Sequence, residues 1–373
     1  MRIAVDARFL RPDTTSQFED FIRELMFRLA KLHPEHQFIF LSDTHIDPLS
    51  LYPNISLVIL APKPSNALLY KWWYDIKVSL ALKKYKADSF ICTSGWCSLT
   101  ASVNQVLIIR DLAFFHNAVF SSKINGYFYR LFRAKFLKKA KLVVALSDFI
   151  KNEIVTAYKA LAPNIAKISG AADRSFKPLD WEEREKVKEQ YAQGCEYFVF
   201  TNAAKPAKNL INLLKAFSIF KKWQKTNMKL VIVMQLAEYK EQEEKIKSYK
   251  YKKEIFFAEY LSKQELAKVT GGAYAMIFPS SYEGFGLPVL EAMQCEVPVI
   301  TSSDRGMAEI AGDAALYVNP ESPEELADKM KRIFKDEQLR NELVTAGKEQ
   351  VKRYSWDKTT ALMWDLIQKA VSR

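Results

Sequence analysis

The sequence predicts an α/β protein with two doubly wound, parallel-sheet (Rossmann-like) domains that face a central cleft. Three observations lead to this prediction. Short apolar runs alternate with helical patterns, as in strands joined by crossover helices. The alternation restarts after Lys177-Pro178, and the length of 373 residues suits two domains of ordinary size. Ligands of such sheets bind beyond the carboxyl ends of the strands, so the cleft is the expected site.

In the first half, strands are expected where apolar residues run without interruption, and helices where they recur every three or four residues. The predicted strands are residues 2–7, 37–42, 57–60, 89–93, 105–109 and 142–147. The predicted helices are residues 17–31, 68–85 and 123–139, with a further helix from Asp148. This order gives a first domain over residues 1–178.

The second half repeats the pattern after an acidic, helical stretch that follows the break at Pro178. The predicted strands are residues 197–201, 230–234, 254–257, 275–278, 297–301 and 314–318. The predicted helices are residues 181–190, 209–224, 239–250, 262–269 and 287–295, and helices fill the remainder. A second domain is therefore expected over residues 179–355, with a separate amphipathic helix over residues 356–373.

Composition narrows the class of protein. No apolar run reaches the roughly 18 residues of a membrane span, and the N-terminus enters a strand without a signal-peptide pattern. The four cysteines and four histidines lack metal-ligand spacing, so we predict no metal site and a cytoplasmic location.

Positive charge is concentrated in one segment. Residues 62–142 hold fourteen Lys or Arg and three acidic residues. The segment's excess of 14 − 3 = +11 is nearly the whole net charge of +12. Aromatic residues are interleaved with these charges in 70–74 and 127–132. Three interpretations fit: a core face with solvated lysines, an anionic membrane surface, or stacking on nucleic-acid bases.

The most informative segment is AMIFPSSYEGFGLPVLEAMQCEVPVITS, residues 275–302. It reads as strand, loop, helix and strand, with Gly284-Phe285-Gly286 before a helix that has Pro288 in its first turn. Backbone N–H groups at such a helix start bind phosphate, and the carboxylates of Glu283 and Glu291 accept hydrogen bonds from sugar or ribose hydroxyls. Taken alone, a Gly-Phe-Gly loop is more often an ordinary turn.

The whole segment resembles the E-x7-E signature of retaining glycosyltransferase family 4, which has the GT-B fold. The positions that match are Ser280, Glu283, Gly284, Phe285, Gly286, Leu287, Pro288, Glu291, Ala292, Met293, Pro298 and Val299. Further segments that resemble the family begin at Asp111, Ser147, Gly170, Lys208 and Glu309. The opening MRIAVDARFL is similar to the mannosyltransferase-like branch, so the resemblance covers essentially the whole chain.

The resemblance implies transfer of a hexose from a nucleoside-diphosphate sugar, GDP-mannose or a UDP-sugar, with retained configuration and without a metal. It implies these roles: Glu291 binds the ribose, Glu283 holds the sugar, residues Gly284, Phe285, Gly286 and Leu287 offer backbone groups, and Lys208 offsets the diphosphate charge. It also implies that the last helix crosses back to the N-terminal domain, which would bind the acceptor. The acceptor would be a saccharide or lipid-linked, in polysaccharide or glycolipid synthesis. This favours an anionic membrane surface at the inner face as partner of residues 62–142, rather than nucleic acid.

Several positions depart from the family pattern. The Gly-Gly loop after the first strand is replaced by residues 14–19, where Ser16 and Glu19 form a capping-box pattern and Glu19 repels an anion. Arg110 replaces the family's histidine and would clamp an anion or pair with Asp111; Lys205 would substitute for a missing arginine. Two alternatives therefore stay open: a catalytically impaired GT-B protein that binds nucleotide sugar or a partner, and a hydrolase with Glu283 and Glu291 as its two carboxylates.

Overall fold

The chain divides into two compact units, each built on one sheet. Unit 1 comprises Met1–Gly170 and Trp356–Arg373, and unit 2 comprises Ala171–Ser355. The computed structural model describes residues 1–11, 17–46, 52–112, 123–158, 164–201, 208–223, 225–234, 240, 246, 248–259, 261–303 and 306–372, without the side chains of 17 and 123–130. The break between the units lies shortly before the sequence-predicted domain boundary at Pro178.

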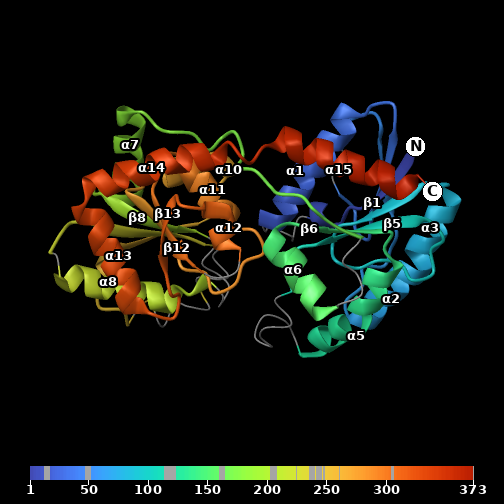
Figure 1. Cartoon of the computed structure of the whole chain (residues 1–373), viewed down its shortest axis with the longest axis horizontal. Helices are drawn as coiled ribbons and strands as arrows, with labels where there is room; N and C mark the ends of the chain where they lie inside the picture. The colour runs from blue at the N-terminus through green and yellow to red at the C-terminus, as the bar shows by residue number, and fades with distance from the viewer. Residues whose placement is uncertain are drawn as a thin grey trace. The chain divides into compact units, whose positions relative to one another are not determined.

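Unit 1 contains a parallel sheet with, in its described part, seven strands in the order β3-β2-β1-β4-β5-β6-β7. The strands are β1 (Arg2–Asp6), β2 (Gln37–Ser42), β3 (Ile55–Ile59), β4 (Ser89–Cys92), β5 (Asn104–Ile109), β6 (Leu142–Ala145) and β7 (Ile165–Lys167). Most of their residues are buried, as expected for a parallel sheet that helices cover on both faces (Figure 1). Strand β7 was not predicted, because three residues at a sheet edge are too short to show a periodicity.

The helices of unit 1 are η1 (Arg8–Leu10), α1 (Gln17–Leu32), α2 (Ala67–Trp72), η2 (Trp73–Val78), α3 (Ser79–Lys84), α5 (Lys123–Lys139), α6 (Asp148–Ala157) and α15 (Trp356–Val371). The predicted helix over 68–85 is present, but its middle turn, η2, is π-helical. The C-terminal helix α15 belongs to unit 1, where Trp364 stacks on His33 with 3.6 Å between the ring centroids.

Unit 2 repeats the topology, with described strands in the order β10-β9-β8-β11-β12-β13. These are β8 (Tyr197–Thr201), β9 (Lys229–Val233), β10 (Ile255–Ala258), β11 (Ala275–Phe278), β12 (Val299–Ser302) and β13 (Ala315–Val318). The helices are α7 (Trp181–Ala192), α8 (Leu210–Trp223), η6 (Lys252–Glu254), α10 (Lys263–Gly271), α11 (Leu287–Gln294), α12 (Met307–Ala311), α13 (Pro323–Lys335) and α14 (Glu337–Val351). Most of the predicted helix 239–250 lies outside the described residues.

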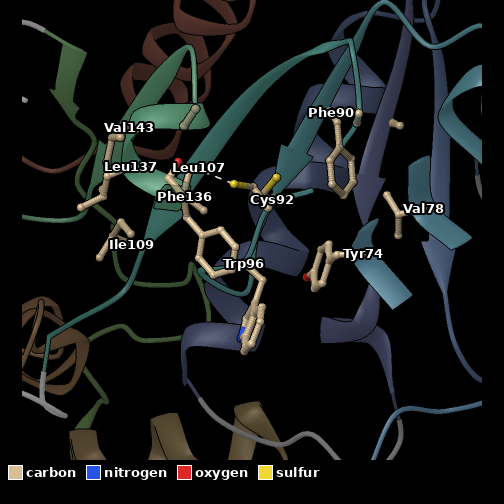
Figure 2. Packing of buried hydrophobic residues seen from close by; sticks show 14 of the residues in the cluster. Tyr74, Val78, Phe90, Cys92, Trp96, Leu107, Ile109, Phe136, Leu137 and Val143 are labelled. Carbon is tan, nitrogen blue, oxygen red and sulfur yellow. Dashed lines mark hydrogen bonds between the residues drawn. The ribbon is translucent and has the colours of Figure 1, made fainter. Parts of the chain in front are cut away.

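Each unit has its own hydrophobic core. In unit 1 the side chains of Tyr74, Phe90, Trp96 and Phe136 pack together against strands β4 and β5 (Figure 2). In unit 2 the core lies between helices α8 and α13 and the sheet. Both sheets therefore have the strand order of a dinucleotide-binding fold, which confirms the predicted fold class and places a switch in strand order between β1 and β4 and between β8 and β11.

Candidate functional site

The candidate site of unit 2 lies at its topological switch point. Strands β8 and β11 are neighbours, and the chain leaves them toward opposite edges of the sheet. A crevice forms there because the two following connections separate. Lys208 follows β8, and Glu283 follows β11, so the topology alone brings these two predicted residues to the same end of the sheet.

Lys208 is buried, with 6% of its surface exposed. Its Nζ donates a hydrogen bond to Glu283 Oε1 and lies 4.5 Å from the centroid of the Phe278 ring. The next residue, Asn209, has a left-handed backbone (φ 66°), and its side chain donates to the carbonyl of Pro320. The lysine is therefore held by a fixed start of helix α8, and its ammonium has a partner of opposite charge.

Glu283 is half-buried in a loop that is tied to the neighbouring strand. Ser280 Oγ lies within hydrogen-bonding distance of Glu283 Oε1, at 3.1 Å. Ser302 Oγ at the end of β12 donates to the carbonyl of Ser280 at 2.6 Å, and Thr301 Oγ1 donates to that of Phe278 at 2.9 Å. These bonds position Ser280 and, through it, the carboxylate.

Ser280 and Phe278 are site residues to which sequence reasoning assigned no role. Ser280 was noted only as a matching position, and Phe278 only as the end of a strand. The signal for both is their place: a buried aromatic residue that ends a central strand, followed within two residues by a hydroxyl side chain. Residues at that end of a strand face the crevice at a switch point.

Gly286 determines how the loop enters helix α11. Its φ of 72° is left-handed, and a methyl group at this position would overlap the side chain of Met307. Gly286 caps the helix without a side-chain hydrogen bond, and Pro288 occupies the first turn. Helix starts of this kind present N–H groups and the positive end of the helix dipole to an anion.

The other residues of the motif differ in whether they pack in the core or lie beside the candidate site. Phe285 is 7% exposed and its ring packs edge-on against Tyr354 at 6.1 Å, so its side chain is structural. Gly284 is buried and Leu287 is half-buried. The expectation that their backbone groups meet a ligand stays a prediction.

Glu291 lies on the second turn of α11 and is half-buried. Burial, with the charge of Glu291 as a second cause, raises the pKa of the Cys295 thiol to about 12. The thiol is therefore protonated at neutral pH. The assignment of Glu291 to a ribose stays a prediction.

Two of the predicted site residues remain, Arg110 and Lys205. Arg110 belongs to unit 1, where it pairs with Asp111 at 3.1 Å and its guanidinium lies 5.4 Å from the Phe18 ring centroid. Lys205 falls outside the described residues. Among the residues that are described, no three His, Cys, Asp or Glu side chains are grouped as metal ligands would be.

Two Rossmann-type sheets, with charged residues after the switch-point strands of the second, define a GT-B glycosyltransferase fold. Residues 182–350 match the profile of the family described as "Glycosyl transferases group 1", so this part of the chain belongs to that family. This span contains Lys208, Glu283 and helix α11.

The relatives in this family are distant. The chain is 28% identical over 230 residues to O-antigen chain mannosyltransferase B of Escherichia coli, covering 60% of this chain and 59% of the relative. It is 27% identical over 296 residues to the O-antigen chain mannosyltransferase RfbU of Salmonella typhimurium, covering 79% of this chain and 77% of the relative. The chain thus spans under two thirds of the length of the E. coli relative.

Solved structures show the same fold across the chain. A sucrose-phosphate synthase from Thermosynechococcus elongatus superposes with a TM-score of 0.81 at 17% identity, covering 99% of this chain and 98% of that one. HepE of Anabaena, in complex with UDP and glucose, gives a TM-score of 0.77 at 14% identity, covering 98% and 99%. At such identities the likeness concerns the fold alone.

Proposed function

We propose that this protein transfers a hexose from a nucleoside-diphosphate sugar, GDP-mannose or a UDP-sugar, to a saccharide or lipid-linked acceptor, with retained anomeric configuration. The observation that carries the proposal is the contact between Lys208 and Glu283 at the switch point of unit 2. The mannosyltransferase names of the two relatives and the UDP and glucose bound by HepE support the donor class.

The proposed donor site uses both ends of this contact. The diphosphate binds at the start of α11, with Lys208 beside it and the backbone of Gly284–Leu287 along it. When the bond from the anomeric carbon to the diphosphate breaks, negative charge grows on the leaving phosphate, where Lys208 stabilises it. The acceptor oxygen bonds to the same carbon and gives its proton to the leaving phosphate. Glu291 holds the ribose, and a divalent metal is not needed.

The ion pair also explains how the donor would be received. In the described structure Lys208 and Glu283 neutralise each other, and Ser280 supports the carboxylate. A diphosphate carries more negative charge than one carboxylate, so it competes for the lysine. Glu283 then turns to donors of its own, and sugar hydroxyls are such donors.

Membrane association is the second part of the proposal. No helix among the described residues is long and apolar enough to cross a bilayer. Four apolar residues at a spacing of four nevertheless stand exposed along α2, η2 and α3: Leu68 (63%), Trp72 (41%), Ile76 (46%) and Leu80 (62%). We call them the apolar stripe. In an α-helix, side chains spaced by four residues drift around the helix axis. The wider π-helical turn η2 in the middle of the segment reduces this drift, so the four side chains stay closer to one line.

The surroundings of the apolar stripe favour an anionic bilayer. Lys77 lies 5.4 Å from the Trp72 ring, and Lys83 and Lys84 end the same helical segment. Basic residues beside an apolar helix face bind anionic headgroups while the apolar side chains enter the interface. Trp73 and Tyr74 of the same segment are fully buried, as the core-face interpretation expects, so the membrane interpretation does not extend to them.

One observation favours the alternative of a catalytically impaired protein. Arg110, which stands in place of a histidine, is engaged with Asp111 and Phe18 rather than free to clamp an anion. Such a protein would bind the nucleotide sugar without turnover.

The experiment that separates these functions is a turnover screen. GDP- and UDP-sugars are incubated with saccharide and lipid-linked acceptors, and release of GDP or UDP is measured for the wild type and for Glu283→Ala. The proposal expects nucleotide release with one donor that needs an acceptor and is lost in the variant. Thermal stabilisation by a donor with no release on any acceptor identifies the impaired protein instead. Full activity of Glu283→Ala refutes the site.

A further inference from the structure

Unit 1 has a cavity at its own switch point. The described residues that line it come from four segments. These are η1 with the residue after it, which follow β1, the stretch that follows β4, and the first turns of α1 and α2. The cavity has a volume of about 260 Å³. Pockets for drug-sized ligands span about 300–1,000 Å³, so this one has room for a single small ring rather than a nucleotide.

The positive charges in the wall are already engaged. Arg8 donates to Asp6 through Nε at 2.9 Å and Nη2 at 3.1 Å, and to the Ser94 hydroxyl at 2.5 Å. Arg11 donates through Nε to Asp43 at 2.8 Å. Because both guanidinium groups face aspartates, the wall carries little excess positive charge with which to attract a phosphate.

Glu19 is the exception among the charged residues of the wall. Its Oε2 is buried and, within the described part of the chain, has no hydrogen-bond partner. A buried carboxylate oxygen without a donor is unfavourable, so a ligand that supplies a hydroxyl there gains a charge-assisted hydrogen bond. The same charge repels a phosphate or carboxylate.

Aromatic side chains form much of the rest of the wall. Phe9, Phe18, Tyr70 and Trp96 come from four different segments and meet around the cavity. Aromatic faces are negatively polarised and pack against polarised C–H groups. A flat ring with C–H groups on its face and hydroxyls on its rim matches both the aromatic walls and Glu19.

We propose that this cavity binds a neutral sugar ring of the acceptor saccharide, with Glu19 Oε2 accepting a hydrogen bond from one of its hydroxyls. This inference rests on the proposed function, because the word acceptor presupposes transfer. The class of ligand does not depend on the proposed function, because the chemistry of the cavity selects an uncharged glycoside whatever reaction follows. The guanidinium of Arg110 lies 5.4 Å from the centroid of the Phe18 ring, which is part of the wall.

The test measures glycoside binding to the full chain in the absence of any nucleotide. The probes are methyl α-mannopyranoside, the matching glucoside and galactoside, and mannose 6-phosphate, each followed by saturation-transfer NMR and calorimetry. The wild type is expected to bind at least one neutral glycoside and not the phosphate. Glu19→Leu and Tyr70→Ala should each weaken binding at least tenfold, whereas Glu19→Gln should bind the glycoside and admit mannose 6-phosphate.

Asp20→Asn is the matched control. Asp20 lies in the same helical turn, pairs with Arg23 at 2.8 Å and is not part of the wall, so its variant should bind like the wild type. Binding of no neutral glycoside, or equal binding by Glu19→Leu, overturns the inference. Donor turnover measured on the same samples separates the two proposals: Glu19-dependent binding without turnover leaves the sugar cavity standing and removes the proposed function.

Discussion

Lys208 and Glu283 form a hydrogen-bonded ion pair although 75 positions separate them in the sequence. The pair exists because β8 and β11 are adjacent and their following loops meet at one end of the sheet. In this state each residue satisfies the other, so a donor must exchange one ionic partner for another.

This exchange predicts opposite effects on binding and on transfer in Glu283→Gln. Without the carboxylate, Lys208 is no longer neutralised, so GDP or UDP should bind several-fold more tightly than to the wild type. Sugar transfer should fall at least a hundredfold, because the group that holds the sugar has lost its charge. Calorimetry with the free nucleotide and a turnover assay check the two halves. If Glu283→Gln lost nucleotide binding together with sugar transfer, the ion pair would be merely structural.

Gly286→Ala should damage the site through its backbone. A left-handed conformation costs a non-glycine residue about 1–2 kcal/mol, and the added methyl group also meets Met307. We expect a lower melting temperature together with loss of nucleotide binding.

The double variant Gly286→Ala/Met307→Ala separates the two causes. It relieves the overlap but not the backbone strain, and it opens a cavity of its own. Met307→Ala alone supplies the reference for that cavity. If Gly286→Ala binds the nucleotide as tightly as the wild type, the helix start is not part of the donor site.

The surroundings of Asp6 predict how the stability of the folded protein depends on pH. Burial alone would raise the pKa of Asp6, but the charge of Arg8 and the hydrogen bonds from Arg8, Ser94 and Tyr74 lower it below its ordinary value of 3.8. A carboxyl with a depressed pKa in the folded state stabilises the protein above the unfolded pKa, and this stabilisation is lost as pH falls through the folded value.

Asp6→Asn should therefore destabilise the protein by about 3–5 kcal/mol at neutral pH, because it leaves the Arg8 guanidinium buried without its partner. The difference from the wild type should shrink below about pH 4. Thermal unfolding between pH 3 and pH 7 measures it, with the exposed pair variant Asp20→Asn as control. A difference that is constant over this range would contradict the assignment.

The apolar stripe predicts binding to anionic vesicles. Trp72→Ser/Ile76→Ser should reduce sedimentation with phosphatidylglycerol vesicles at least tenfold, while both proteins bind neutral vesicles weakly. Added salt should weaken wild-type binding, since each lysine near the surface contributes about 1 kcal/mol of electrostatic attraction.

Trp181→Ser is the control for this experiment, because Trp181 is 75% exposed on unit 2. It should bind vesicles as the wild type does. Equal binding by the stripe variant and the wild type would place any membrane contact elsewhere.

Much of the fold followed from local pattern. Strands such as Tyr197–Thr201 and Ala275–Phe278 are continuous apolar runs, and their predicted bounds are those observed. The order of the strands is not local, but right-handed crossovers restrict it to few solutions. The sequence failed where the signal is weak or depends on packing: β7 is too short, and the burial of Trp73 beside an exposed Trp72 depends on which face of the helix meets the sheet.

The candidate site was predictable in its residues but not in its contacts. Glu283 and Lys208 stand in segments that resemble family motifs, yet no spacing in the sequence gives their ion pair. The surroundings of Glu19 were equally hidden, because its cavity is assembled from four segments of unit 1. Nothing in the linear order indicates that a carboxylate oxygen there finds no donor among the residues that the structure describes.

The most direct test of the central claim is the dissociation constant of GDP and of UDP, measured by calorimetry for the wild type and for Lys208→Met. If the diphosphate docks at the start of α11 beside Lys208, the wild type binds one of the two nucleotides and the variant binds it at least tenfold more weakly, a loss of about 1.4 kcal/mol. Equal affinity in the two proteins, or no affinity in the wild type, contradicts the donor site described above.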